Sequence, residues 1–124
     1  MNVKKRNIGI SYAWNGIKEV FRSELNFRLH IVAAIVVICS GVICHLTKIE
    51  WAFILICIAI VLITEIVNSA IEKMMDFLNP EHHPSVKVIK DIAASSVLIA
   101  AFFAAIIGTI IFAPKIIDFI QGLL

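Results

Sequence analysis

The sequence predicts an all-α membrane protein in which an amphipathic surface helix precedes three transmembrane helices. The 124-residue chain is 60% hydrophobic and only 16% charged, whereas soluble domains are about 45–50% apolar and about 25% charged. A soluble domain this short would expose large apolar patches, and disordered chains are poor in apolar residues. The apolar residues also fall into three long runs, each close to the roughly 20 residues that a membrane-spanning helix needs. A helical membrane protein is therefore the expected class.

Residues of about 8–26 are expected to form the surface helix. Ile10, Trp14, Ile17, Phe21 and Leu25 recur at spacings of three and four, and charged residues occupy the opposite face. A helix with this pattern and with Trp and Tyr, placed directly before a membrane span, is suited to the lipid headgroup layer. The alternative is a cytosolic helix that binds a partner protein.

Three spans are expected at about 28–47, 51–75 and 91–113. The first and third contain uncharged runs, and Trp51 opens the second where an interfacial aromatic anchor is common. Residues 77–87 hold two prolines and predict a loop, and Pro114 is expected to break the third helix before a short amphipathic tail. The three spans leave no room for a separate soluble domain, so residues 1–124 are expected to form one integral-membrane domain.

The basic residues predict the orientation of the chain in the membrane. Of the 11 Lys and Arg residues, nine precede the first span or flank the 77–87 loop, and only Lys48 and Lys115 lie on the other side. Cytoplasmic loops carry such an excess of Lys and Arg, so the N-terminus and the 77–87 loop are expected to be cytoplasmic. The net charge of +2 is too small to indicate nucleic-acid binding.

The second span carries a stripe of polar residues that points to function. Glu65, Asn68, Glu72 and Asp76 follow one another at +3, +4 and +4, which places them within an arc of about 80° on one helix face. Ionisable groups at membrane depth are costly and by default functional. For Asp76 alone, the solvated end of a helix is an equally good explanation.

The stripe has the residue types that phosphoryl transfer needs. Two carboxylates and an amide near the cytoplasmic interface can hold Mg²⁺, which is usually bound by one or two carboxylates together with substrate phosphates. A deeper carboxylate can accept the proton of a lipid hydroxyl. Glu24, Lys90 and Asp91 are expected at the same depth and add carboxylates and a cation for phosphate. The chain has no glycine-rich phosphate loop, so helix-borne side chains would have to do this chemistry.

The histidines are less informative. His82 and His83 are expected either to form a solvated polar turn or to contact a nucleotide above the stripe. His30, one turn inside the first span, could form a hydrogen bond to another helix.

Four segments resemble the small prokaryotic integral-membrane diacylglycerol kinase family, which includes the undecaprenol kinases. They are EIVNSAIEKMMD (65–76), AWNGIK (13–18), ELNFR (24–28) and EHHPSVKVIKDIAASSVLIAA (81–101). The resemblance implies a homotrimer with active sites at subunit boundaries, in the bacterial inner (cytoplasmic) membrane. It also implies transfer of the γ-phosphate of Mg-ATP to a membrane lipid alcohol.

The resemblance also implies roles for single residues. Glu65 matches the general base, Glu24 and Glu72 match the magnesium-binding carboxylates, and Asn68 and Asp76 match supporting polar residues. The positions implied for ATP contact are Tyr12, Glu24, Glu72, Glu81, His82, His83, Lys90 and Asp91. Those implied for the lipid groove are Trp14, Phe27, Arg28, Glu65 and Ala94.

The sequence leaves two lipid alcohols as candidate substrates, undecaprenol and diacylglycerol. His30 stands where some diacylglycerol-specific members carry an acidic residue, and this residue and the EHHP loop favour undecaprenol slightly over diacylglycerol. His82 replaces a tyrosine of some members. A small proton-conducting or transport bundle is a remote alternative, because intramembrane Glu and Asn also serve in proton relays, but the stripe ends at one interface. A purely structural oligomer would leave the stripe unexplained.

Overall fold

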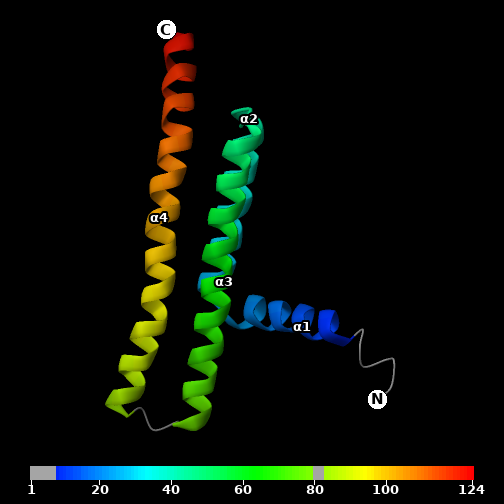
Figure 1. The fold of residues 1–124 in the computed structure, drawn as a ribbon, viewed down its shortest axis with the longest axis vertical. Coiled ribbons are helices and arrows are strands. Elements are labelled where there is room, and N and C mark those ends of the chain that lie inside the picture. The colour runs from blue at the N-terminus through cyan, green and yellow to red at the C-terminus, as the bar shows by residue number, and fades with distance from the viewer. Residues whose placement is uncertain (1–7, 80–82) are drawn as a thin grey trace.

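The computed structural model describes residues 8–79 and 83–124, and the regular structure in these ranges is entirely helical. The helices are α1 (Ile8–Ser23), α2 (Leu25–Ile43), α3 (Lys48–Leu78) and α4 (Pro84–Leu123). Figure 1 shows α2, α3 and α4 running side by side, while α1 leaves the bundle across its long axis. The expected helical fold with three long apolar helices is confirmed.

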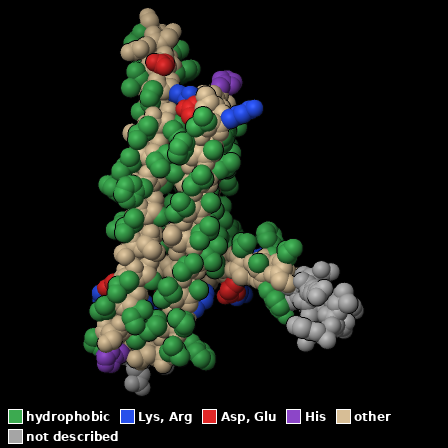
Figure 2. All heavy atoms as spheres, viewed as in Figure 1, with side chains coloured by type: hydrophobic (Ala, Val, Ile, Leu, Met, Phe, Trp, Pro, Cys, Tyr) green, Lys and Arg blue, Asp and Glu red, His purple; other side chains and the backbone are tan. Residues whose placement is uncertain are grey.

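The three long helices have the length and the surface of membrane-spanning segments. With a rise of 1.5 Å per residue, α3 is about 46 Å and α4 about 60 Å long, against about 30 Å for the hydrocarbon core of a bilayer. Both can therefore cross a membrane and extend beyond it. Most large apolar side chains lie on the outside of the bundle, and Figure 2 shows them covering its length while charges gather toward the ends.

The central helix is α3, which packs against α2 on one side and α4 on another. Across the described ranges, α2 and α4 make no direct backbone contact with each other. The buried apolar cluster of Leu46, Ile54 and Ile111 lies toward the α2–α3 turn, with Trp51 packed against it. The apolar core thus holds one end of the bundle, and the polar residues of α3 lie toward the other.

The turn between α2 and α3 is held by local hydrogen bonds. His45 has a φ of 53°, the N–H of Leu46 donates to the Gly41 carbonyl at 3.2 Å, and the N–H of His45 donates to the Val42 carbonyl at 3.3 Å. This is a Schellman ending with histidine in the left-handed position. The side chain of Thr47 then caps α3 and forms a capping box with Glu50.

An elbow separates α1 from α2. Glu24 has extended backbone angles (φ −115°, ψ 112°), so α1 ends at Ser23 rather than at about residue 26. Arg28 donates through Nη1 to the carbonyls of Phe21 and Arg22 at 3.1 and 3.0 Å. A cation at the carbonyl end of a helix is favourable, and this one ties the last turn of α1 to the first turn of α2.

Two expectations about the second half of the chain were wrong. Pro114 does not break the third long helix, because α4 continues unbroken from Pro84 to Leu123 with Pro114 inside it. Apolar helices tolerate proline when neighbouring groups satisfy the freed carbonyl. The 77–87 connection is also shorter than expected, since α3 reaches Leu78 and α4 begins at Pro84, where the fixed φ of proline suits a first helical turn.

Candidate functional site

The polar stripe of α3 lies on its packed face and becomes more exposed along the helix. Glu65, Asn68 and Ser69 are 3%, 7% and 0% exposed, Glu72 is half-buried, and Asp76 is exposed. Helical spacing brings these five side chains to one side of α3. A carboxylate and an amide held out of water are costly to bury, which favours a functional role for them over a structural one.

The middle of the stripe is incompletely satisfied within one chain. The Asn68 amide donates to Glu72 Oε1 at 3.5 Å, a long hydrogen bond. Among the described residues, Asn68 Oδ1 and Ser69 Oγ are buried without a hydrogen-bond partner. Buried polar atoms of this kind call for an explanation, and a ligand or a second subunit at this face would provide one.

Three ionisable groups act on Glu65: His30 on α2, Glu24 at the elbow and Glu72 on α3. His30 Nε2 on α2 lies 3.9 Å from Glu65 Oε2, and the carboxylates of Glu24 and Glu72 act on Glu65 electrostatically. Glu24 is half-buried at the elbow, and its side chain does not cap α2. The fold therefore brings the carboxylates of Glu24, Glu65 and Glu72 into one electrostatic cluster.

The carboxylates of this cluster have the ligand type that a hard cation needs, but they do not form a complete metal site by themselves. Glu24 and Glu72 offer oxygen donors, the ligand type that Mg²⁺ takes. Over residues 8–79 and 83–124, no group of three or more His, Cys, Asp or Glu side chains is arranged to hold a metal by itself. Mg²⁺ keeps several waters and is usually bound by one or two carboxylates together with substrate phosphates, so two carboxylates can be enough when a phosphate is present.

The stripe is linked to α4 at its exposed end. Lys90 on α4 pairs with Asp76 on α3, so the lysine expected to meet phosphate does lie beside the stripe. Asp91 instead pairs with Lys87 at 2.7 Å along the exposed face of α4. These residues lie near the α3–α4 connection, where Figure 2 shows charged side chains near the foot of the bundle.

The structure assigns His83 a local role. Its Nδ1 accepts a hydrogen bond from the Ser85 N–H at 3.1 Å and caps the start of α4. This leaves its role in nucleotide contact a prediction. Glu81 and His82, two further positions expected to contact ATP, lie outside the described residues.

The expected ATP and lipid contacts on α1 lie away from α4. Tyr12 and Trp14 are exposed, and the Lys18 ammonium lies 5.9 Å from the Trp14 ring centroid. Within the described chain, α1 contacts α2 and α3 but not α4, as its course in Figure 1 illustrates. One chain therefore does not bring Trp14 together with Ala94, which is exposed on α4.

Two other residues expected in a lipid groove are engaged within the chain. Phe27 is 2% exposed and packs inside the chain. Arg28 is half-buried and donates to the end of α1 as described above. Any contact with lipid would add to these structural roles.

Sequence reasoning missed three features of the site. Ser69 is fully buried, and its +4 spacing from Glu65 could have placed it in the stripe. His30 was expected to bond to another helix, but its partner Glu65 was not foreseen. The contact of Lys73 with Glu19, 3.9 Å across α3 and α1, had no sequence signal because the direction of α1 depends on the elbow.

The fold and the cluster together define a class: a helical membrane protein with a carboxylate-rich site toward one end of its bundle. Residues 11–112 match the family described as prokaryotic diacylglycerol kinase. The chain belongs to this family, whose members compared below are named as lipid kinases.

Relatives in three bacteria support the assignment. The chain is 40% identical over 105 residues to the undecaprenol kinase of Bacillus subtilis, with 85% of each chain covered. It is 32% identical over 112 residues to a diacylglycerol kinase of Synechocystis sp., covering 90% of this chain and 64% of that protein. It is 30% identical over 95 residues to the diacylglycerol kinase of Escherichia coli K12, covering 77% of this chain and 78% of that protein.

Proposed function

We propose that this chain transfers the γ-phosphate of ATP to the hydroxyl of a membrane lipid alcohol, with Glu65 as the general base. The observation that carries the proposal is the buried Glu65 carboxylate within a cluster that also holds Glu24 and Glu72. The lipid oxygen bonds to the γ-phosphorus as the bond from that phosphorus to the bridging oxygen of ADP breaks. The hydroxyl proton passes to Glu65, a transfer that contributes about 10²–10⁴-fold in rate.

Glu24 and Glu72 are the residues that would hold magnesium, and Asn68 and Asp76 support them. Magnesium supplies charge neutralisation at the phosphates. The Asn68 amide donates to Glu72 and so orients one of the two carboxylates. Asp76 keeps Lys90 beside the stripe, from where the ammonium can reach a phosphate oxygen. Tyr12, Glu81, His82, His83 and Asp91 complete the proposed ATP contacts.

Undecaprenol is the proposed lipid, and undecaprenyl phosphate the product. The 40% identity to the Bacillus subtilis undecaprenol kinase supports this choice. The alternative is diacylglycerol, with phosphatidic acid as the product, as the relatives in Synechocystis sp. and Escherichia coli suggest. Trp14, Phe27, Arg28 and Ala94 are proposed to line the groove that admits either alcohol from the bilayer.

We further propose a homotrimer in the bacterial inner membrane, with the N-terminus and the α3–α4 connection cytoplasmic. The orphaned polar atoms of Asn68 and Ser69 support a site that another subunit completes. The separation of Trp14 from α4 supports it as well. Small residues along α4 permit close helix packing. The number three comes from the family resemblance.

A side-by-side assay tests the proposed substrate. Purified protein in bilayers receives radiolabelled ATP and either undecaprenol or diacylglycerol at equal mole fraction. We expect kcat/KM to be at least tenfold higher for undecaprenol than for diacylglycerol. Labelling of both lipids would show that the groove accepts either alcohol. A preference for diacylglycerol would select the alternative. Absence of labelled lipid, together with proton leak in protein-containing vesicles, would favour the transport bundle.

A further inference from the structure

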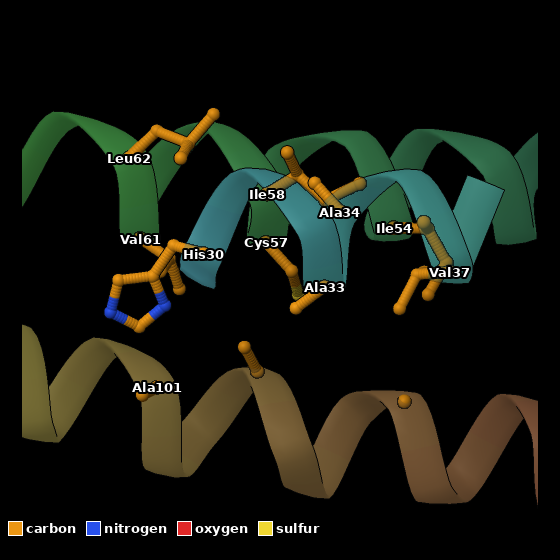
Figure 3. A pocket seen from close by; sticks show the side chains of 12 residues that line it. His30, Ala33, Ala34, Val37, Ile54, Cys57, Ile58, Val61, Leu62 and Ala101 are labelled. Carbon is orange, nitrogen blue, oxygen red and sulfur yellow. The ribbon is translucent and has the colours of Figure 1, made fainter. Parts of the chain in front are cut away.

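An apolar cavity of about 220 Å³ lies between α2, α3 and α4, and His30 stands in its wall. Figure 3 shows the cavity with α2 and α3 on one side and α4 on the other. The imidazole of His30 reaches between Val61 of α3 and Ala101 of α4. Apart from His30, the lining consists of aliphatic side chains, Cys57 and Gly108.

His30 has one polar contact that joins two helices. Its Nε2 lies 3.9 Å from Glu65 Oε2, and the side chains are 26% and 4% exposed. Within the part of the chain that the structure describes, His30 is the cation-forming residue within ion-pair distance of Glu65. The other charged groups that act on Glu65 are the carboxylates of Glu24 and Glu72, which repel it.

We propose that His30 is a positioning residue, which aims the Glu65 carboxylate at the lipid hydroxyl from across the α2–α3 interface. The inference rests on the proposed role of Glu65 as the base. The Glu65 side chain can adopt several rotamers. Repulsion from the carboxylates of Glu24 and Glu72 favours rotamers that point the Glu65 carboxylate away from both. A donor on α2 favours the rotamer that faces α2. Catalytic contacts are commonly long in a ligand-free enzyme and shorten when substrate binds, so a separation of 3.9 Å suits this role.

The cavity explains why this position can orient the base. The other residues that line it are aliphatic apart from Cys57 and Gly108, so no carboxylate or amide in this lining competes with Glu65 for His30 Nε2, which lies 3.9 Å from Glu65 Oε2. Misplacing a reacting group by about 1 Å can cost about 10²-fold in rate. A donor on the facing helix that favours one orientation of Glu65 limits such displacement.

Two substitutions separate this role from simple packing. Gln carries a donor near the place of Nε2, whereas Leu keeps the apolar volume and carries no donor. We expect kcat for lipid phosphorylation to fall about tenfold in His30→Leu and less in His30→Gln. A Glu65 carboxylate in the wrong orientation slows the reaction without weakening substrate binding. The KM for ATP is expected to stay unchanged in both variants. His45→Asn is the matched control, since His45 is exposed at the opposite end of α2, and its kcat should equal that of wild type.

The double variant His30→Leu/Glu65→Gln completes the test. If His30 acts through Glu65, the double variant is no slower than Glu65→Gln alone. The proposal is overturned if His30→Leu matches or exceeds His30→Gln in kcat, or if the two substitutions slow the reaction independently. An active Glu65→Gln enzyme would instead contradict the proposed function, so the two failures are distinguishable. Circular dichroism and ATP binding confirm that each variant is folded.

Discussion

The acidic residues Glu65, Glu72 and Asp76 of α3 differ in burial along one helix face, and this gradient is consistent with the separate roles proposed for them. Glu65 is almost fully enclosed, Glu72 is half-buried, and Asp76 is exposed beside Lys90. In the proposed reaction, the lipid hydroxyl reaches the site from the membrane, whereas ATP and magnesium reach it from water. The enclosed carboxylate therefore suits the lipid, and the two more exposed ones suit the nucleotide.

Glu72→Gln is expected to raise the magnesium concentration needed for half-maximal lipid phosphorylation by about tenfold, because a hard cation loses one carboxylate ligand. Maximal velocity at saturating magnesium should fall less than the affinity. The measurement is kinase activity against magnesium at fixed ATP. Asp118→Asn, at the far end of α4, is the control and should leave the magnesium curve unchanged. An unchanged curve for Glu72→Gln would remove this residue from the metal site.

The stripe was predictable from the sequence, whereas its contacts were not. Helical spacing alone places Glu65, Asn68, Glu72 and Asp76 on one face. The pairing of His30 with Glu65 depends on how α2 docks on α3, and that of Lys90 with Asp76 on how α4 returns along α3. Neither docking geometry is encoded in local periodicity.

At the scale of elements, the α2–α3 turn depends on close packing at Gly41. A Cβ at Gly41 would lie 2.7 Å from Trp51 Cη2 and 2.9 Å from Leu46 Cδ1. Gly41→Ala is therefore expected to destabilise the fold by about 1–3 kcal/mol, the usual cost of overpacking. Thermal unfolding in detergent measures this. Gly122→Ala, where no atom lies within 4 Å of the new Cβ, is the control, and equal stability of the two variants would contradict the packing described.

The elbow between α1 and α2 depends on Arg28. Arg28→Ala removes both hydrogen bonds to the end of α1, and we expect α1 to become more mobile relative to the bundle. A spin label on α1 should then show a broader distance distribution to a second label on α3. Lys18→Ala, which removes a cation from the exposed face of α1, should leave the distribution narrow. An equally narrow distribution in Arg28→Ala would show that other contacts hold the elbow.

Local sequence patterns predicted the helices well, except where contacts with neighbouring helices override the local preference of a residue. Apolar periodicity predicted the first helix and long uncharged apolar runs predicted the other three, but the residues near Glu24 gave no sign of the extended backbone that ends α1. Proline was read as a helix breaker at position 114, but α4 passes through it. The next residue, Lys115, pairs with Glu50 of α3 at 3.1 Å, which keeps the helix beyond the proline beside α3.

At the scale of the whole molecule, the distribution of Lys and Arg predicts the orientation in the membrane. With the native cysteines replaced by serine, Ser85→Cys should be protected from an impermeant thiol reagent in intact cells. Lys48→Cys, at the opposite end of the bundle, should react. Both should react once the membrane is permeabilised, which is the control. The reverse labelling pattern would mean that the site faces outward and could not receive cytoplasmic ATP.

The central claim is that the buried carboxylate on α3 performs the chemistry of a lipid kinase, and one comparison tests it directly. Wild type and Glu65→Gln are reconstituted in bilayers with the preferred lipid alcohol, and both ATP binding and single-turnover phosphorylation are measured. We predict that Glu65→Gln binds ATP as wild type does and phosphorylates lipid at least about 100-fold more slowly, since a positioned base contributes about 10²–10⁴-fold. Near-wild-type phosphorylation by Glu65→Gln would contradict the account.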